Sequence, residues 1–230
     1  MRDDPNFATF LNSIKNAKTT GLGKDAEYAL WINTYNALAI AMVNDNPCKK
    51  RFFGLKKCKV VGIREVGTII SPVWKRPAGT VGGEMVSLDE IEHAKLRAPE
   101  GYPADPLLHA CIVCASVSCP DVAPKAYKPE TLQADMEENM RLFLQNPTKG
   151  LSLDKAAGVI TLSKVFLWFE EDFTTKVGNA SVLDTLLPYM PEDVKTYVSE
   201  HKDALKINHF EYDWGLNGPP PGAAGKNGRC

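Results

Sequence analysis

Apolar residues recur three and four positions apart over several stretches of this chain, as on one face of an amphipathic helix. The clearest stretch begins at Asp25, which can cap a helix, and ends near Asn44. Two polar residues of this stretch, Asn33 and Asn36, lie beside the apolar face. Amides in such surroundings need hydrogen-bond partners, so they either hold nearby loops, the favoured interpretation, or contact a ligand. The apolar face itself consists of Tyr28, Trp31, Ile32, Tyr35, Leu38, Ala39 and Met42.

Caps, prolines and short apolar runs predict the remaining elements. The segment Ser87-Leu-Asp-Glu90 has the capping-box pattern, which predicts a helix from Leu88 to about Arg97. Further helices are expected at 129–147, 163–173, 181–190 and 192–201, a hairpin at 151–153 and 159–162, and a last strand at 207–212.

The apolar run 107–115 is predicted to be a buried strand that ends in a small polar turn. Side chains alternate along a strand, so His109 and Cys111 would share one face and Cys114 would lie on the other. Cys111 and Cys114 would then form no redox pair, and His109 would not touch Cys114. Beyond the turn, Pro120 suits the first position of a helix, which would make Cys119 an N-cap with a stabilised thiolate.

Length and composition indicate a globular protein of one large domain or two small ones. The chain has 230 residues, of which 44% are hydrophobic and 24% charged. The order of the expected elements predicts an α+β fold, a single domain that is mainly helical around a small β-sheet, over residues 1–217. Residues 218–230 are rich in proline and glycine and are predicted to form a disordered tail.

Charge and targeting signals narrow the expected partners and compartment. The formal net charge is −1, and we interpret the basic cluster of residues 49–51, 56 and 57 as a solvated helix face. No apolar stretch is long enough to span a membrane, so neither nucleic acid nor a membrane is expected as a partner. Six cysteines are too few for a disulfide scaffold, and the N-terminus lacks the apolar segment of a signal peptide. We therefore expect reduced thiols in a cytoplasmic protein, unless a leader has already been removed.

Five segments occur in a characteristic order: 30–36, 87–93, 109–120, Trp168 with Asp172-Phe173, and 212–217. In that order they resemble the DUF547 family, a domain named for its unknown function, over residues 25–217. Where that family usually has a basic residue after Asp105-Pro106, this chain has Leu107. The family occurs alone and joined to glutaredoxin-like and other modules, which implies a thiol connection but supplies no established reaction.

The resemblance also implies a wall for a binding site. Trp31, Asn33, Tyr35 and Asn36 fall in one of the matching segments and are the expected substrate-binding residues. The alternative is that all four only support the scaffold.

A thiol-dependent enzyme is the leading functional hypothesis. Cys114 and Cys119 are five residues apart across a turn and could approach as nucleophile and resolving thiol. On the capped helix, His93 would take the thiol proton and Glu90 or Glu92 would orient its ring. We include His109 as a further catalytic candidate. The expected reaction is acyl transfer, thiol transfer or hydrolysis of a small molecule or protein substrate, without a cofactor.

Two alternatives remain open at this point. His93, His109, Cys114 and Cys119 supply a Cys₂His₂ set for zinc, although their spacing fits no standard zinc finger. A non-enzymatic protein-interaction module would instead keep its cysteines as small buried residues and expose an apolar patch of partner size.

Overall fold

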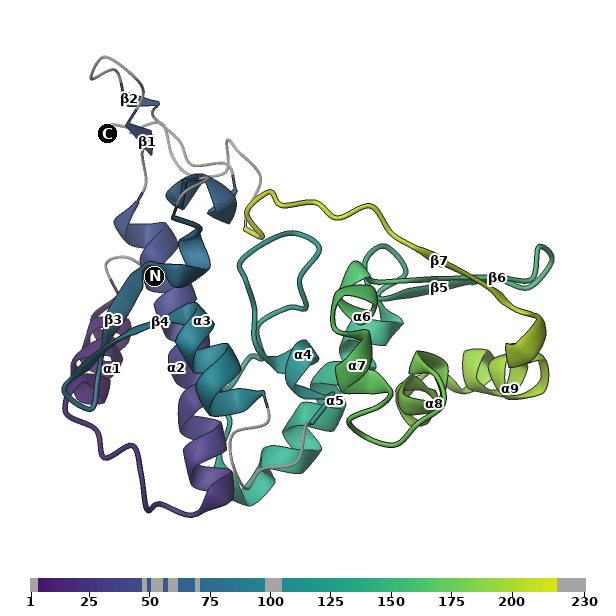
Figure 1. Ribbon diagram of the computed structural model, residues 1–230, viewed down its shortest axis with the longest axis horizontal. Coiled ribbons are helices and arrows are strands. Elements are labelled where there is room, and N and C mark those ends of the chain that lie inside the picture. Colours follow the sequence, from purple (N-terminus) through teal and green to yellow (C-terminus); the bar gives the residue numbers. More distant parts are fainter. Residues whose placement is uncertain are drawn as a thin grey trace.

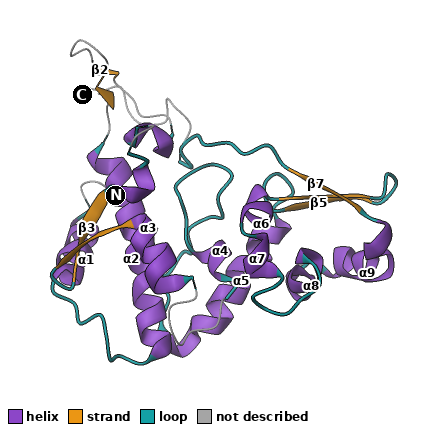
Figure 2. Ribbon diagram, in the orientation of Figure 1, coloured by secondary structure: helices purple, strands orange, loops and turns teal. Residues whose placement is uncertain are grey.

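The computed structural model describes residues 4–46, 49–50, 56–57, 62–68, 71–97 and 105–218. Helices predominate, and three small sheets accompany them (Figure 2). The expected tail lies outside the described residues from position 219 onward.

The N-terminal half is built around helix α2 (Lys24–Asp45), which confirms the helix predicted at this place. Helix α1 (Pro5–Lys15) packs beside it together with the antiparallel hairpin β3 (Pro77–Val81) and β4 (Glu84–Ser87) (Figure 1). The hairpin turn, Gly82-Gly83, needs positive φ at both residues, which glycine adopts without a steric penalty. Its two N–H groups donate to the last carbonyls of α1, and this docks the hairpin on the helix end.

Strand β4 leads directly into the capped helix. The Ser87 hydroxyl accepts from the Glu90 N–H, and the Glu90 carboxylate accepts from the Ser87 N–H, which confirms the predicted capping box. The α-helical turn α3 (Leu88–Glu90) continues as a π-helix over Ile91–Leu96, closed by a hydrogen bond from the Arg97 N–H to the Glu92 carbonyl. The sequence did not predict this π-helix, a form that is frequent at functional sites.

The C-terminal half contains helix α5 (Leu132–Gln145), which a 3₁₀ turn at Pro129–Thr131 precedes, and a three-stranded sheet. In that sheet β5 (Leu151–Asp154) and β6 (Val159–Leu162) form the predicted hairpin, and β7 (Lys206–His209) runs parallel to β6. The helices between the strands are α6 (Lys164–Trp168), α7 (Glu170–Phe173), α8 (Val182–Leu186) and α9 (Glu192–His201). The aromatic helix expected over 163–173 is therefore two short helices that meet at Phe169.

One hydrophobic core joins the two halves. Buried side chains of α2, such as Ile32, belong to the same cluster as Met140 of α5 and Phe166 of α6. The predicted single α+β domain is confirmed. In Figure 1 the chain after β7 returns across the molecule to the loop that follows α4, and this return completes the candidate site.

The prediction of a strand over 107–115 is wrong. Residues Leu108–Cys111 form a short helix, α4, and an irregular loop follows. The carboxylate of Asp105 accepts the N–H of Leu107 at 2.9 Å and begins the turn. Residues 107 to 113 are all buried, so the run is apolar on every side, and the periodicity of so short a run does not distinguish a strand from a buried helix.

The basic cluster also differs from expectation. Lys49–Lys50 (β1) pairs antiparallel with Lys56–Lys57 (β2), so these residues do not form the expected helix face. Within the described parts of the chain, no helix combines the length and the apolar character needed to cross a membrane.

Candidate functional site

A cavity of about 220 Å³ lies where the π-helix, the loop after α4 and the C-terminal segment meet. Its polar lining comes from Asp89, Glu92 and His93 of the capped helix and from His109 of α4. Cys114 and Cys119 contribute their sulfurs. The rest of the wall is mainly aromatic: Tyr35, Trp74, Trp168, Phe169, Tyr212 and Trp214.

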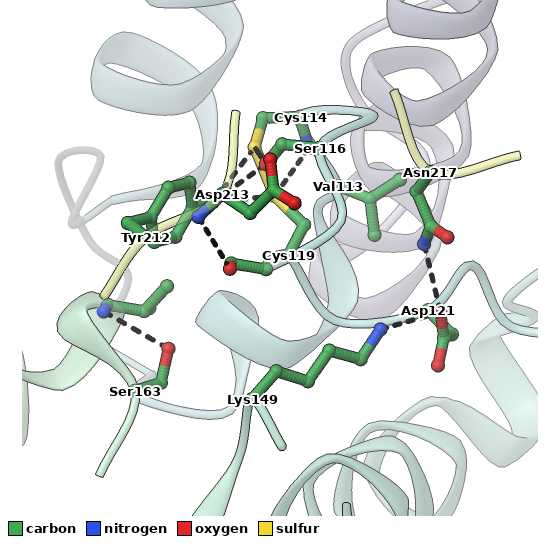
Figure 3. The surroundings of a disulfide bond; sticks show 12 residues. Val113, Cys114, Ser116, Cys119, Asp121, Lys149, Ser163, Tyr212, Asp213 and Asn217 are labelled. Carbon is green, nitrogen blue, oxygen red and sulfur yellow. Dashed lines mark hydrogen bonds and ion pairs between the residues drawn. A yellow bond between two sulfur atoms is a disulfide. The ribbon is translucent and has the colours of Figure 1, made fainter. Parts of the chain in front are cut away.

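Cys114 and Cys119 form a disulfide, with their Cα atoms 6.3 Å apart (Figure 3). The predicted approach of these two residues is confirmed, whereas the expectation of reduced thiols is wrong for this pair. Cys114 is partly exposed and Cys119 is buried. The two residues therefore differ in exposure, although both line the cavity.

The loop between the cysteines is shaped by its own backbone. Ala115 has a φ of +58°, a left-handed conformation that is uncommon for a residue other than glycine. The chain turns back so that the Cys114 N–H donates to Cys119 Sγ at 3.1 Å. No helix begins at Pro120, so the predicted N-cap role of Cys119 is wrong. A single amide of the loop, rather than a helix end, points at this sulfur.

The C-terminal segment holds the disulfide loop from the other side. The Val117 N–H donates to the Gly215 carbonyl and the Asn217 N–H to the Ala115 carbonyl, both at 2.8 Å. The Asp213 N–H donates to the Ser118 hydroxyl at 2.9 Å. These bonds join residues 95 to 102 positions apart in the sequence.

Tyr212 brings a hydroxyl group to both sulfurs. Its oxygen lies 3.2 Å from Cys114 Sγ, 3.1 Å from Cys119 Sγ and 2.9 Å from the Ser116 hydroxyl (Figure 3). Burial raises the pKa of Tyr212, and the hydrogen bond with Ser116 only partly opposes this. The hydroxyl therefore stays protonated at neutral pH and has one proton to donate.

His109 lines the cavity from α4, the short helix found in place of the predicted strand. Its Nε2 lies 2.8 Å from Asp172 Oδ2, and its ring stacks on Phe169 at 4.3 Å between centroids. Burial lowers the pKa of His109, and this outweighs the opposite effect of Asp172. The ring is therefore neutral at pH 7, with its Nε2 proton donated to the carboxylate.

Asp172 is the buried anion of the site. Arg97 Nε lies 2.7 Å from Oδ2 and Lys176 Nζ lies 2.6 Å from Oδ1, in addition to His109. Burial alone would raise the pKa of Asp172, but hydrogen bonds from His109, Arg97 and Lys176 hold it well below its ordinary value. The carboxylate fixes both the imidazole of α4 and the guanidinium at the end of the π-helix.

His93 is held in a different way. Arg97 Nη1 lies 3.0 Å from His93 Nδ1, and because a guanidinium only donates, Nδ1 accepts and Nε2 carries the proton. The Asp89 carboxylate lies 3.7 Å from Nε2. The expected orienting residue, Glu90, instead serves the capping box and does not line the cavity, so the carboxylate beside His93 is Asp89.

Glu92 lies deeper in the same wall. The Tyr35 hydroxyl donates to its carboxylate at 3.5 Å, and Arg97 Nη1 is 4.0 Å away. Burial raises the pKa of Glu92, although His93 and Arg97 act in the opposite direction.

The comparison with known families is decisive here. A family model described as "Protein of unknown function, DUF547" matches residues 19–144, more than half of the chain. The chain belongs to the DUF547 family. No curated protein and no solved structure matches it.

The matched span of this DUF547 protein contains α2, the π-helix and the disulfide loop, whereas Asp172 and Tyr212 lie beyond it. Sequence reasoning assigned no role to these two residues or to Arg97. Two features of the sequence could have drawn attention to these residues. Asp172 and Tyr212 lie in segments that resemble the family, and Asp172 is a carboxylate among the aromatic residues of 163–173. Neither signal indicates which distant side chain such a residue contacts.

The four expected wall residues of the DUF547 domain have separate roles. Tyr35 lines the cavity, whereas Trp31 is buried in the core beneath Lys95, whose Nζ is 5.4 Å from the ring centroid. The Asn33 amide pairs with the backbone N–H and carbonyl of Tyr127.

Asn36 makes a similar pair of bonds at the end of α4. Its amide donates to the Cys111 carbonyl at 2.8 Å and accepts from the Val113 N–H at 2.9 Å. Neither Asn33 nor Asn36 lines the cavity, so both hold loops, in agreement with the favoured interpretation. Asn36 fixes the point at which the disulfide loop leaves α4.

The zinc hypothesis receives no geometric support. Its two sulfur ligands are bonded to each other, and a tetrahedral site would need both as thiolates. Across the residues that the structure describes, no three His, Cys, Asp or Glu side chains are grouped so as to hold a metal ion.

Proposed function

We propose that this DUF547 protein is a thiol–disulfide oxidoreductase with the Cys114–Cys119 disulfide as its redox centre. The observation that carries the proposal is a disulfide in the wall of a cavity, with one cysteine partly exposed, the other buried, and hydrogen-bonding groups beside both sulfurs. Thiol transfer is thereby favoured among the reactions expected from the sequence.

The reaction begins at the accessible sulfur. A substrate thiolate attacks Cys114 Sγ, a mixed disulfide forms, and Cys119 leaves as a thiolate. A second substrate thiol attacks the substrate sulfur of the mixed disulfide, which releases the oxidised substrate and leaves two protein thiols. Two electrons pass from substrate to protein, and the protons of the two substrate thiols end on Cys114 and Cys119.

The leaving sulfur has a backbone N–H donor, whereas the described contacts of Cys114 Sγ are the hydroxyls of Ser116 and Tyr212. The Cys114 N–H already points at Cys119 Sγ, and the single proton of Tyr212 can turn to it as negative charge develops. Donors that are in place before charge appears stabilise a thiolate without reorganisation. The Ser116 hydroxyl can accept a hydrogen bond from the Tyr212 hydroxyl or donate one to it as the Tyr212 hydroxyl turns.

His109 is the base that the site offers. Its Nε2 proton is held by Asp172, which leaves the Nδ1 lone pair for the proton of an incoming thiol. His93, the base expected from the sequence, has Nδ1 engaged by Arg97. We therefore assign proton removal to His109 and a role in the cavity wall to His93.

Trapping of the mixed disulfide tests the proposal. When treated with a small symmetrical disulfide, the Cys119→Ser variant should form a mixed disulfide at Cys114 and release the other half of the reagent as a free thiol, as peptide mass spectrometry would show. The Cys114→Ser variant should form far less mixed disulfide at Cys119. Cys111→Ser is the control for a cysteine outside the cavity, and it should exchange like the unmodified protein.

Equilibration with thiol redox buffers gives the second measurement. The disulfide should open and close reversibly while the protein stays folded by circular dichroism. Opening only in denaturant would refute the proposal and would favour the interaction-module alternative, in which these sulfurs are structural.

A further inference from the structure

The charged side chains that line the cavity are all of one sign. Asp89 and Glu92 are both carboxylates, and none of the described residues in the lining is a lysine or an arginine. Asp89 is 34% exposed and Glu92 15% exposed, so both can interact with a molecule that enters. Arg97, a cation beside the cavity, is bound to the buried Asp172.

The aromatic wall also favours a ligand with positive charge. Ring faces attract cations through their quadrupole and disfavour anions. Arg64, which is not among the lining residues, illustrates this, because its guanidinium carbon lies 4.9 Å from the Trp214 ring centroid. Trp168, which stacks on Trp214 and contacts Tyr212, is 46% exposed and presents further ring surface.

The disulfide and the carboxylates that would select a cation therefore line the same cavity. A thiol with an anionic group would face two carboxylates and several ring faces, and none of the described lining residues is a lysine or an arginine that would replace its lost hydration. A thiol with an ammonium group would meet complementary charge beside the disulfide.

Resting on the thiol–disulfide function argued above, we propose that the cavity selects thiols that carry a cationic group close to the sulfur. Two sources share this chemistry, a small aminothiol and a cysteine flanked by basic residues in a peptide. Asp89 and the exposed ring of Trp168 bind the cation, while the thiolate reaches Cys114.

The first experiment measures reduction of the disulfide by thiols matched in size. One arm compares cysteamine with 3-mercaptopropionate, and the other compares the peptides Lys-Cys-Lys and Glu-Cys-Glu. Each rate is divided by the rate of the same thiol with bis(2-hydroxyethyl) disulfide, which removes differences in intrinsic thiol reactivity. In each reaction two thiols are oxidised to one disulfide, and the protein disulfide is reduced to two thiols.

The cationic member should be favoured by about tenfold or more in at least one arm, and that arm identifies the source. Asp89→Asn should lower this preference severalfold. Asp193→Asn, a carboxylate on α9 that does not line the cavity, should leave it unchanged. Equal normalised rates for both charges in both arms would overturn the proposal.

The second experiment separates charge selection from redox chemistry. Benzyltrimethylammonium, which has no thiol, should quench tryptophan fluorescence of the oxidised protein saturably, and benzenesulfonate should not. Binding of the cation without thiol exchange would refute the oxidoreductase function and leave a cation site. Exchange without binding of the cation would refute the selectivity alone.

Discussion

Helix α4 and the loop that follows it are adjacent in sequence but differ in what surrounds their sulfurs. Cys111, at the end of α4, is fully buried, donates to the Leu107 carbonyl at 3.2 Å, and has a pKa that burial raises well above its ordinary value. Cys114, three residues later, is partly exposed and contacts two hydroxyl groups. Position relative to the cavity, and not the Cys-x-x-Cys spacing, decides which sulfur can react.

The same contrast applies to the forces that hold the two segments. Asp172 fixes α4 through a buried ionic network around His109, whereas backbone pairing and one tyrosine hydroxyl hold the loop. Damage on the α4 side should therefore reduce stability in addition to any loss of proton removal by His109, whereas damage on the loop side should reduce mainly the rate of disulfide exchange.

The largest effect should follow the loss of Asp172. Asp172→Ala removes a buried carboxylate and leaves Arg97, His109 and Lys176 without their common partner. We expect a loss of about 3–5 kcal/mol in the free energy of unfolding, measured by urea denaturation. The exposed Asp193→Asn should change it by less than about 0.5 kcal/mol. A loss below about 1 kcal/mol for Asp172→Ala would contradict the structural role assigned to the network.

The sequence predicted those elements of the structure that depend on the spacing of nearby residues. The helix at 24–45, the capping box at Ser87 and the hairpin at 151–162 follow from periodicity, caps and turns, and all three are present. The approach of Cys114 to Cys119 also follows from a short turn.

The rest depends on contacts between distant residues. Tyr212 reaches the two sulfurs across more than ninety residues, and Asp172 reaches His109 across 63. No local pattern encodes such partners. Burial on every side also removed the periodicity that would have identified α4 as a helix.

The two sulfurs themselves give the next largest effect. After reduction of the folded protein, iodoacetamide should modify Cys114 at least about a hundredfold faster than Cys111, because Cys111 reacts only through local opening. Peptide mass spectrometry at successive times measures both rates in one sample. Similar rates in the folded state would remove the distinction between the two segments.

Tyr212 tests the loop side alone. Tyr212→Phe keeps the ring among Trp168 and Trp214 but removes the hydroxyl beside both sulfurs. Loss of one hydrogen bond to a developing thiolate should slow disulfide exchange by about tenfold. The rate of Cys111 alkylation is the internal control and should not change. An unaltered exchange rate would mean that the Cys114 N–H, and not the Tyr212 hydroxyl, stabilises the leaving thiolate.

The smallest effect concerns the titration of His109. Its folded-state pKa lies below the ordinary value of 6.5, so below pH 6.5 the unfolded chain binds more protons than the folded protein. Stability should therefore be complete above pH 6.5 and should fall, by about 1 kcal/mol at most, as pH decreases to 5.5. Asp172 stays ionised throughout this window because its pKa is held far lower. Urea denaturation at both pH values should show a shallower dependence in His109→Gln, and this difference isolates His109 from His209, whose pKa burial also lowers. An identical pH dependence in the variant would mean that the lowered pKa of His109 does not affect the free energy of unfolding.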